Sequence, residues 1–360
     1  MISLLKHEKP LFLAILAAIT GFLLEHAIIE AGRGAQTLAT GVFLAIIIAA
    51  ALRVAHHGEL LARRLGEPYG TMILTLSAVT VEVVILAMMM FSGGGPTLAR
   101  DTVYSALMLD INGILGMAAI VGGLKHGEQP YNLDSGNSYV SMILVAAGVS
   151  MFVPEFIPAG KWQAYSAFTI VCMVVLYALF LRMQTGRHSY FFDYTYADDT
   201  AQDDGHHAGS KTGHHALLLV ASLVLIGFLS ELMAAFMNHA LAGSGVPTIV
   251  PAIVVALISA SPEVLTALRA AQNNRMQAVM NIALGASLAT VVLTIPVVEA
   301  IALMTGQPIS MGLTPVQTAM LLLTLLVASI NLNDGETNAI EGYTHAALFA
   351  TFLFLSGLGV

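Results

Sequence analysis

The sequence predicts an all-α integral membrane protein: an N-terminal transmembrane helix followed by two inverted repeats of five helices each, eleven transmembrane helices in total. The first observation is composition, since 57% of the 360 residues are hydrophobic and only 10% are charged, whereas soluble domains carry about 25% charged residues. The second is that apolar runs of membrane-spanning length recur along the chain. The third is that two similar segments, one in each half, each place a glutamate inside such a run. These features exclude a soluble enzyme.

The apolar runs are bounded by glycines, prolines and charged residues. They predict spans near residues 10–30, 35–55, 69–91, 101–123, 138–157, 162–182, 215–238, 246–270, 275–304, 312–332 and 341–359. The first run resembles a signal peptide, but Glu25, His26 and Glu30 stand where a small-residue cleavage site would be. We therefore expect it to remain as a helix.

The positive residues predict the orientation. With a cytoplasmic N-terminus, all lysines and arginines except Arg33, Arg100 and Lys161 fall on the cytoplasmic side, as the positive-inside rule requires. We expect a multi-pass protein of the bacterial inner membrane with a periplasmic C-terminus. The net charge of −8 argues against a nucleic-acid partner, and the single Cys172 excludes a disulfide framework. The expected partners are the lipid bilayer and the transported ions, and the oligomeric state stays open.

Four regions follow from these spans: an N-terminal helix (1–34), a first repeat (35–182), an acidic and histidine-rich cytoplasmic linker (183–214) and a second repeat (215–360). The linker includes Asp198, Asp199, Asp203, Asp204, His206 and His207. Its composition is typical of a solvated linker. The alternative is a cation- or pH-responsive regulatory segment, because histidines change charge near neutral pH.

The two repeats share a short pattern. Residues 76–84 and 257–265 each carry a hydroxyl residue two positions before a glutamate, Glu82 or Glu263, in the second span of each repeat. Because five is an odd number, the repeats enter the membrane from opposite sides, an arrangement that places transporter sites near the midplane, on broken helices at the repeat interface. Several residues can supply such breaks: Pro68 with Gly70, and Pro247, Pro251 and Pro262.

Glu82 and Glu263 are the central candidates, because an ionisable residue at membrane depth costs at least about 3 kcal/mol. The alternative is that each is protonated and only joins helices through a hydrogen bond. Two ionised carboxylates meeting at the midplane would repel each other and bind protons. A hard divalent cation would neutralise both, with further oxygens replacing its water. Competition between protons and a metal cation for this pair predicts exchange.

Other polar residues of the spans are candidate ligands or members of a proton path. The neutral candidates are Ser77, Thr80, Asn112, Ser259, Ser261, Asn281 and Ser287. Asp110 is either a site carboxylate or a buried polar contact, and Glu299 is expected to reach the membrane interface. Glu341 and His345 share a helix face, as a proton relay or as an ordinary polar pair at a span end.

These residues resemble the calcium/cation antiporter superfamily, and within it the bacterial calcium/proton antiporters of the ChaA type. The resemblance is carried by residues 57–70 leading to Glu82, by 96–102, by 261–263 and by 281–296. It implies ten core helices plus an extra N-terminal helix, proton-driven export of calcium, sodium or potassium, and Glu82 and Glu263 as shared ion and proton ligands. The Gly-Asn common before the motif glutamate is replaced by residues 78–80 and 259–261, which leaves the preferred cation open.

The sequence argues against two other functional classes. A cation channel without obligatory proton coupling would need a continuous polar pathway, whereas the polar residues here are few and scattered. A membrane-embedded enzyme would need a catalytic motif, and His7-Glu8 lacks the second histidine of a zinc site. We therefore expect a secondary active transporter that needs no cofactor. A sodium (potassium)/proton antiporter with little calcium activity is the nearest alternative.

Overall fold

The computed structural model describes residues 8–65, 69–194 and 212–360. The six linker residues named as regulatory candidates, Asp198, Asp199, Asp203, Asp204, His206 and His207, lie outside these ranges.

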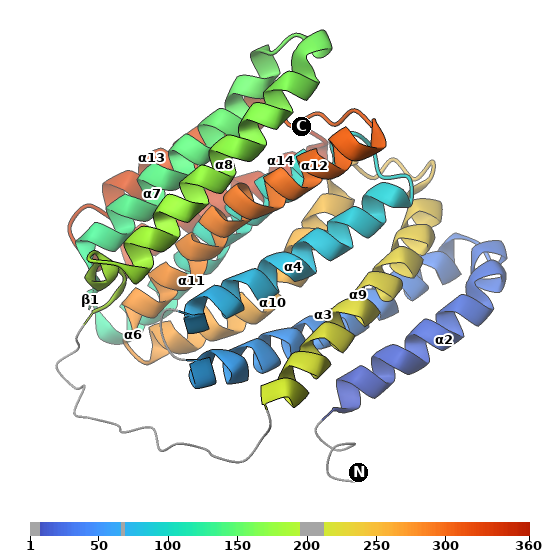
Figure 1. The fold of residues 1–360 in the computed structure, drawn as a ribbon, viewed down its shortest axis with the longest axis horizontal. Helices are drawn as coiled ribbons and strands as arrows, with labels where there is room; N and C mark the ends of the chain where they lie inside the picture. The colour runs from blue at the N-terminus through green and yellow to red at the C-terminus, as the bar shows by residue number, and fades with distance from the viewer. Residues whose placement is uncertain (1–7, 66–68, 195–211) are drawn as a thin grey trace.

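The described chain is almost entirely helical (Figure 1). The first part contains α2 (Lys9–Glu30), α3 (Arg33–Leu65), α4 (Tyr69–Phe91), α5 (Leu98–Met108), the π-helical η1 (Leu109–Leu115), α6 (Gly116–His126), α7 (Leu133–Ala147), η2 (Gly148–Phe152), η3 (Val153–Phe156), η4 (Ala159–Lys161), α8 (Trp162–Thr185) and η5 (Ser189–Phe192). The second part contains α9 (Thr212–Leu241), α10 (Val250–Gln272), α11 (Met276–Ala289), the π-helical η6 (Thr290–Thr294), α12 (Ile295–Thr305), α13 (Pro315–Asn331) and α14 (Ala339–Leu358). Two short strands, β1 (Gln129–Pro130) and β2 (Glu336–Thr337), pair in antiparallel fashion.

The helices confirm the predicted membrane fold. Among the described residues, eight helices are long and apolar enough to cross a membrane, and α13 and part of α4 are shorter apolar helices. Counting α5–η1–α6, α7–η2–η3 and α11–η6–α12 as one segment each, helical segments lie at all eleven predicted positions. The largest difference is α3, which continues ten residues beyond the predicted end at residue 55, because residues 59–65 are all good helix formers.

The packing of the helices reflects the inverted repeats. Each repeat consists of α3, α4, α5–α6, α7 and α8, or of α9, α10, α11–α12, α13 and α14. The two first helices, α3 and α9, pack against each other. The fifth helix of one repeat packs against the third segment of the other: α14 contacts η1 and α6, while α8 contacts η6 and α12. The extra helix α2 lies at one edge of the bundle, beside α3 and α9 (Figure 1).

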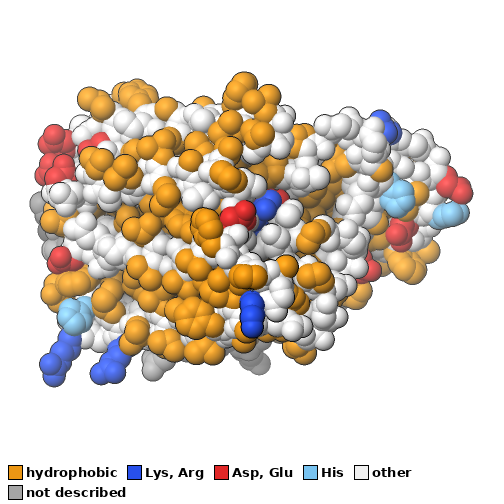
Figure 2. Space-filling view, turned by 90° about the horizontal axis from the view of Figure 1, so that it is seen from above, with side chains coloured by type: hydrophobic (Ala, Val, Ile, Leu, Met, Phe, Trp, Pro, Cys, Tyr) orange, Lys and Arg blue, Asp and Glu red, His pale blue; other side chains and the backbone are white. Residues whose placement is uncertain are grey.

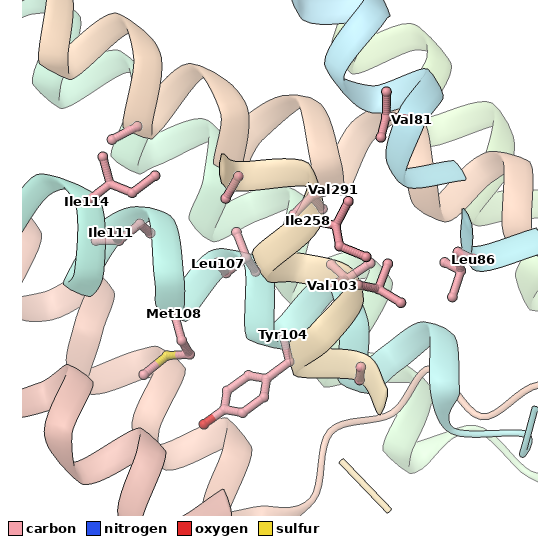
Figure 3. Packing of buried hydrophobic residues seen from close by; sticks show 14 of the residues in the cluster. Val81, Leu86, Val103, Tyr104, Leu107, Met108, Ile111, Ile114, Ile258 and Val291 are labelled. Atoms are coloured by element: carbon pink, nitrogen blue, oxygen red, sulfur yellow. The ribbon is translucent and has the colours of Figure 1, made fainter. Parts of the chain in front are cut away.

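The third segment of each repeat lies in the centre of the bundle. Buried residues make up 72% of the apolar window in α5–η1–α6 and 61% in α11–η6–α12, compared with 17% in the peripheral α2. Figure 3 shows Val103 and Leu107 of the first of these segments near Ile258 of α10 and Val291 of η6, while Met108 points away from them. In contrast, the surface in Figure 2 carries many hydrophobic side chains, and many charged ones lie toward its two ends, as expected of a surface in contact with lipid.

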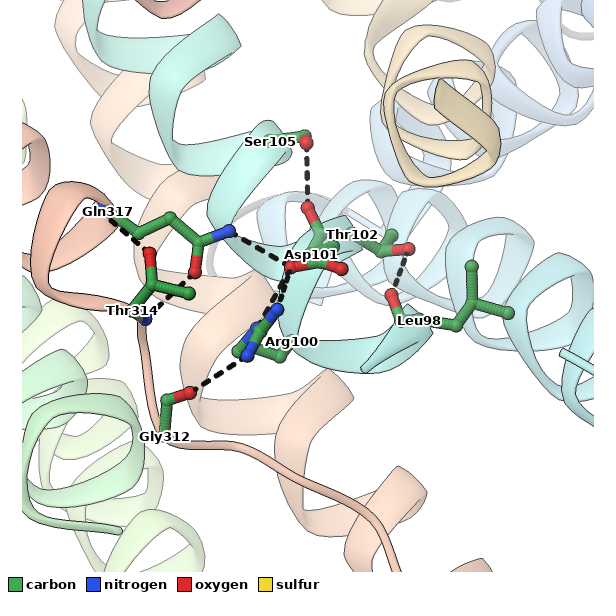
Figure 4. Close-up of polar contacts among 8 residues, drawn as sticks. All are labelled: Leu98, Arg100, Asp101, Thr102, Ser105, Gly312, Thr314 and Gln317. Carbon is green, nitrogen blue, oxygen red and sulfur yellow. Dashed lines mark hydrogen bonds and ion pairs between the residues drawn. The ribbon is translucent and has the colours of Figure 1, made fainter. Parts of the chain in front are cut away.

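Hydrogen bonds join loops that the sequence places on the same side of the membrane. On the predicted outer side, Arg100 donates to the carbonyl of Gly312, and Asp101 joins Arg100 to Gln317 at the start of α13 (Figure 4). On the predicted inner side, Lys125 donates to the carbonyl of Gln272. The predicted alternation of the loops is therefore internally consistent.

The expectation of a helix break at Pro262 is wrong, because α10 runs continuously through this residue. Proline lacks the N–H that would bond the carbonyl four residues earlier. The hydroxyl of Ser261 donates to that carbonyl, on Ile258, at 2.8 Å and so replaces the missing donor. Pro68 lies outside the described residues. The irregular backbone is found instead in the π-helical turns η1 and η6 of the neighbouring central segments.

Candidate functional site

A cavity of about 340 Å³ lies between the two repeats, with walls from α3, α4, α5, η1, α10, α11 and η6. It is lined by Glu82 from α4, Glu263 from α10 and Asp110 from η1. Most of the remaining wall is apolar and consists of alanine and valine side chains. The second helix of each repeat therefore brings its glutamate to one shared space.

The carboxylate of Glu82 is buried and held at one oxygen. Its Oε2 accepts hydrogen bonds from the hydroxyls of Thr290, at 2.9 Å, and Thr294, at 3.3 Å. Its Oε1 is buried without a partner among the described residues. Two hydroxyl donors from the π-turn of the opposite repeat stabilise a charged carboxylate, and the second oxygen is left for a ligand.

Glu263 lies in a different environment. Its side chain lines the cavity, is partly exposed, and makes no hydrogen bond with other described residues. Ser259 and Thr266, one turn before and after it, line the same cavity, so these three residues share one face of α10. On this wall of the site, the glutamate side chain is therefore less fixed by hydrogen bonds than Glu82 is on the opposite wall.

Asp110 completes a group of three carboxyl side chains. It is buried in η1, and its Oδ2 accepts a hydrogen bond from the hydroxyl of Ser287 at 3.3 Å. It interacts electrostatically with both Glu82 and Glu263, which also interact with each other. Within the described residues, however, no three acidic, histidine or cysteine side chains are close enough together to hold a metal ion. A cation in this space would need either water or a movement of the walls.

Asn281 lines the cavity near the segment that follows α8. Its Nδ2 donates to the carbonyl of Phe192 at 2.8 Å, and its Oδ1 accepts from Nε2 of Gln277 at 3.0 Å. The amide is therefore held at both ends and joins α11 to η5.

Five of the predicted candidates are not part of the cavity wall, among them Ser287, which reaches the site only through its hydrogen bond to Asp110. Ser77, Thr80 and Ser261 donate their hydroxyl hydrogens to carbonyls of their own helices. Asn112 bonds to Thr324 and His345 on α13 and α14. Conversely, Thr290 and Thr294 bond Glu82 but were not among the predicted candidates, although their spacing of four residues inside an apolar run puts both hydroxyls on one helix face.

Comparison with known proteins identifies the family. The sodium/calcium exchanger protein family matches this chain over residues 35–186 and 214–358. The chain belongs to this family. The resemblance seen in the sequence is thereby confirmed, and the protein is a member of a family of membrane exchangers, not an enzyme.

Relatives with names and solved structures agree with this assignment. The chain is 35% identical over 313 residues to the sodium-potassium/proton antiporter ChaA of Escherichia coli, with 85% of each chain covered. It superposes on the structure of the Ca2+/H+ antiporter protein YfkE with a TM-score of 0.70 at 18% identity, covering 94% of this chain and 99% of the other. The H+/Ca2+ exchanger CAX gives a TM-score of 0.67 at 18% identity, covering 97% and 88%. The two structures establish a shared fold.

Proposed function

We propose that this exchanger is a secondary active transporter that exports cytoplasmic cations in exchange for external protons, by alternating access at Glu82 and Glu263. The observation that carries the proposal is that these two residues, from equivalent helices of inverted repeats, line one cavity together with Asp110. The names of the relatives, a sodium-potassium/proton antiporter and two calcium/proton exchangers, support a cation/proton antiporter.

The chemistry of exchange follows from competition. Carboxylates that are poorly solvated and close to one another are stable only when protons or a cation neutralise them. A cation that binds between Glu82 and Glu263 displaces their protons, and protons arriving from the other side displace the cation. If the cavity opens to one side of the membrane at a time, each displacement becomes a transport step.

Calcium is the proposed principal cation, with sodium or potassium as alternatives. Calcium takes six to eight oxygen ligands, most often carboxylates, carbonyls and water, and the wall offers three carboxyl groups with Ser259, Thr266 and Asn281. An exchanger for sodium or potassium with little calcium activity is the second candidate. It is favoured by the sparse wall of neutral oxygens and by the name of the relative from Escherichia coli.

We further propose that the protein lies in the bacterial inner membrane with its N-terminus in the cytoplasm. The distribution of lysine and arginine supports this orientation. With this orientation, the hydrogen-bonded loops around Lys125 and Gln272 face the cytoplasm, and those around Arg100 and Gly312 face the periplasm.

Everted membrane vesicles with an acid interior test the proposal. Addition of calcium, sodium or potassium is expected to dissipate the pH gradient with the native protein and to fail with Glu82→Gln or Glu263→Gln. Glu231→Gln is the matched control, because Glu231 is an exposed glutamate of α9. Exchange at the native rate by both cavity variants would refute the two-glutamate mechanism. Cation flux without any movement of protons would indicate a channel.

A further inference from the structure

A second buried polar cluster lies behind the cavity, where α14 packs against α6 and η1. The two helices approach closely because glycines face each other. A Cβ on Gly342 would lie 2.7 Å from the carbonyl oxygen of Gly116 and from the amide nitrogen of Ile120. This close contact brings His345, one turn along α14, against Asn112 of η1, where their side chains lie 2.9 Å apart.

The hydrogen bonds of this cluster define the proton positions on His345. The hydroxyl of Thr324 donates to the sulfur of Met108, so its oxygen accepts from Nδ2 of Asn112 at 2.8 Å. The amide oxygen of Asn112 therefore faces His345, and Nδ1 of His345 must carry the hydrogen that it donates. In a neutral imidazole the other nitrogen, Nε2, is then an acceptor.

That acceptor has no donor. Nε2 of His345 is buried without a partner among the described residues, and only 2% of this histidine is exposed. Oε2 of Glu341, four residues earlier on the same helix face, is also buried and unpartnered. Each orphaned atom costs about 1–3 kcal/mol. The two atoms belong to an acid and a base on one face of α14, one turn apart, and no hydrogen bond or ion pair joins them in this structure.

We infer that Glu341 and His345 form a proton-binding pair outside the cation cavity, through which protons leave for the cytoplasm. The inference rests on the proposed function and its orientation. When rotation of the two side chains brings these atoms together, a proton on Nε2 of His345 passes to Oε2 of Glu341: the N–H bond breaks, an O–H bond forms, and the imidazole returns to its neutral state. Glu341 is half-buried at the cytoplasmic end of α14 and releases the proton to water.

The surroundings of the pair fit this role. Towards the cytoplasm, Glu341 interacts with the negative charge of Asp334 and accepts a hydrogen bond from Asn338. Towards the membrane interior, His345 contacts Asn112, and Asp110, two residues earlier in η1, lines the cavity. The π-helical turn η1 thus carries both Asp110, at the cation cavity, and Asn112, which contacts His345.

The other repeat holds a comparable group. Glu299 of α12 is 1% exposed, so it does not reach the interface as the sequence suggested, and its Oε2 has no partner among the described residues. It faces α8, where Ser166 and Tyr165 interact with it. Because α8 and α14 are equivalent helices, each repeat packs a buried ionisable residue between its own fifth helix and the third segment of the other repeat.

Purified protein in liposomes separates proton release from cation binding. Two modes are measured with labelled sodium and, in parallel, labelled calcium: exchange against protons, and exchange against the same unlabelled cation, which moves no net protons. His345→Asn keeps the δ-position donor to Asn112 and removes Nε2, while Glu341→Gln keeps the bond to Asn338 and removes the titratable oxygen. Glu336→Gln, an exposed carboxyl of β2, is the control.

We expect both variants to slow exchange against protons at least about tenfold, as for loss of an acid–base group, and to leave cation self-exchange within about twofold. The dependence of rate on cytoplasmic pH is expected to change, and that on external pH to remain. An equal fall in both modes would assign the pair a packing role, and unchanged rates in both would exclude it; either result overturns the inference. Native protein that shows neither mode would instead refute the proposed function.

Discussion

Replacing Gly342 with alanine is expected to disrupt the contact between α14 and α6. The new methyl group would lie 2.7 Å from the carbonyl oxygen of Gly116 and 2.7 Å from the amide nitrogen of Ile120. Both are backbone atoms of a helix, so a change of rotamer cannot relieve the overlap and the two helices must separate. The hydrogen bond between His345 and Asn112, one turn further along, would lengthen with them.

The magnitude follows from two opposing contributions. Overpacking of this kind costs about 3 kcal/mol, the upper part of the usual range, because the neighbours are rigid. Alanine gains about 1 kcal/mol over glycine in helix propensity. The net expected loss is therefore about 2 kcal/mol in the free energy of unfolding.

Gly357→Ala is the matched control on the same helix, because nothing lies within 4 Å of its added Cβ. It is expected to gain the propensity contribution alone, so the two variants should differ by about 3 kcal/mol. Both are measured by unfolding the purified protein with a denaturing detergent, followed by circular dichroism. Equal stabilities of the two variants would refute the close approach of α14 and α6.

Three further predictions concern individual polar contacts. Thr290→Val removes a donor that stabilises the Glu82 carboxylate in its cation-binding form. Because hydrogen bonds to a charged group are worth about 1.5–3 kcal/mol, the KM for the cation should rise roughly tenfold or more. An unchanged KM in vesicle assays would contradict this. Burial alone raises the pKa of Glu8, but the guanidinium of Arg53, together with His57, outweighs it and holds this pKa below the usual 4.5. The stability from this pair is present above pH 4.5 and is lost as the pH falls through the lowered pKa, so Glu8→Gln should lower the melting temperature at neutral pH and match the native protein in acid; a constant difference would exclude the pair as the cause. Ser261→Ala leaves the carbonyl freed by the proline without its donor and should cost about 1 kcal/mol of unfolding free energy, whereas native stability in the detergent titration would show that this bond contributes nothing.

The sequence was sufficient to predict the helices and the pair of glutamates. Long apolar runs have few structural alternatives in a membrane, because every backbone polar group must be bonded internally. Because an ionisable side chain inside a membrane costs free energy, Glu82 and Glu263 could be recognised as candidates from the sequence alone. Their convergence on one cavity followed from the odd number of spans in each repeat.

The remaining features depend on contacts between distant segments. Thr290 and Thr294 bond Glu82 across more than two hundred residues, and a threonine in an apolar run carries no sign of its partner. The π-helical turns result from local shifts in backbone bonding that composition does not reveal. Ser261 was predicted as a candidate ligand because it stands two positions before Glu263, and in the structure its hydroxyl donates to a carbonyl of its own helix.

The strand pair between β1 and β2 constrains how the protein can move. Gln129 pairs with Thr337, which ties the end of α6 in the first repeat to the beginning of α14 in the second. Since α8 and α12 also pack across the repeat boundary, each half of the sequence has a helix embedded in the other. The bodies that shift during a transport cycle therefore cannot coincide with the two halves of the gene product. A crosslink between residues 129 and 337 would therefore leave the transport cycle intact. If the two sequence halves rocked separately, the pairing of β1 with β2 would have to break.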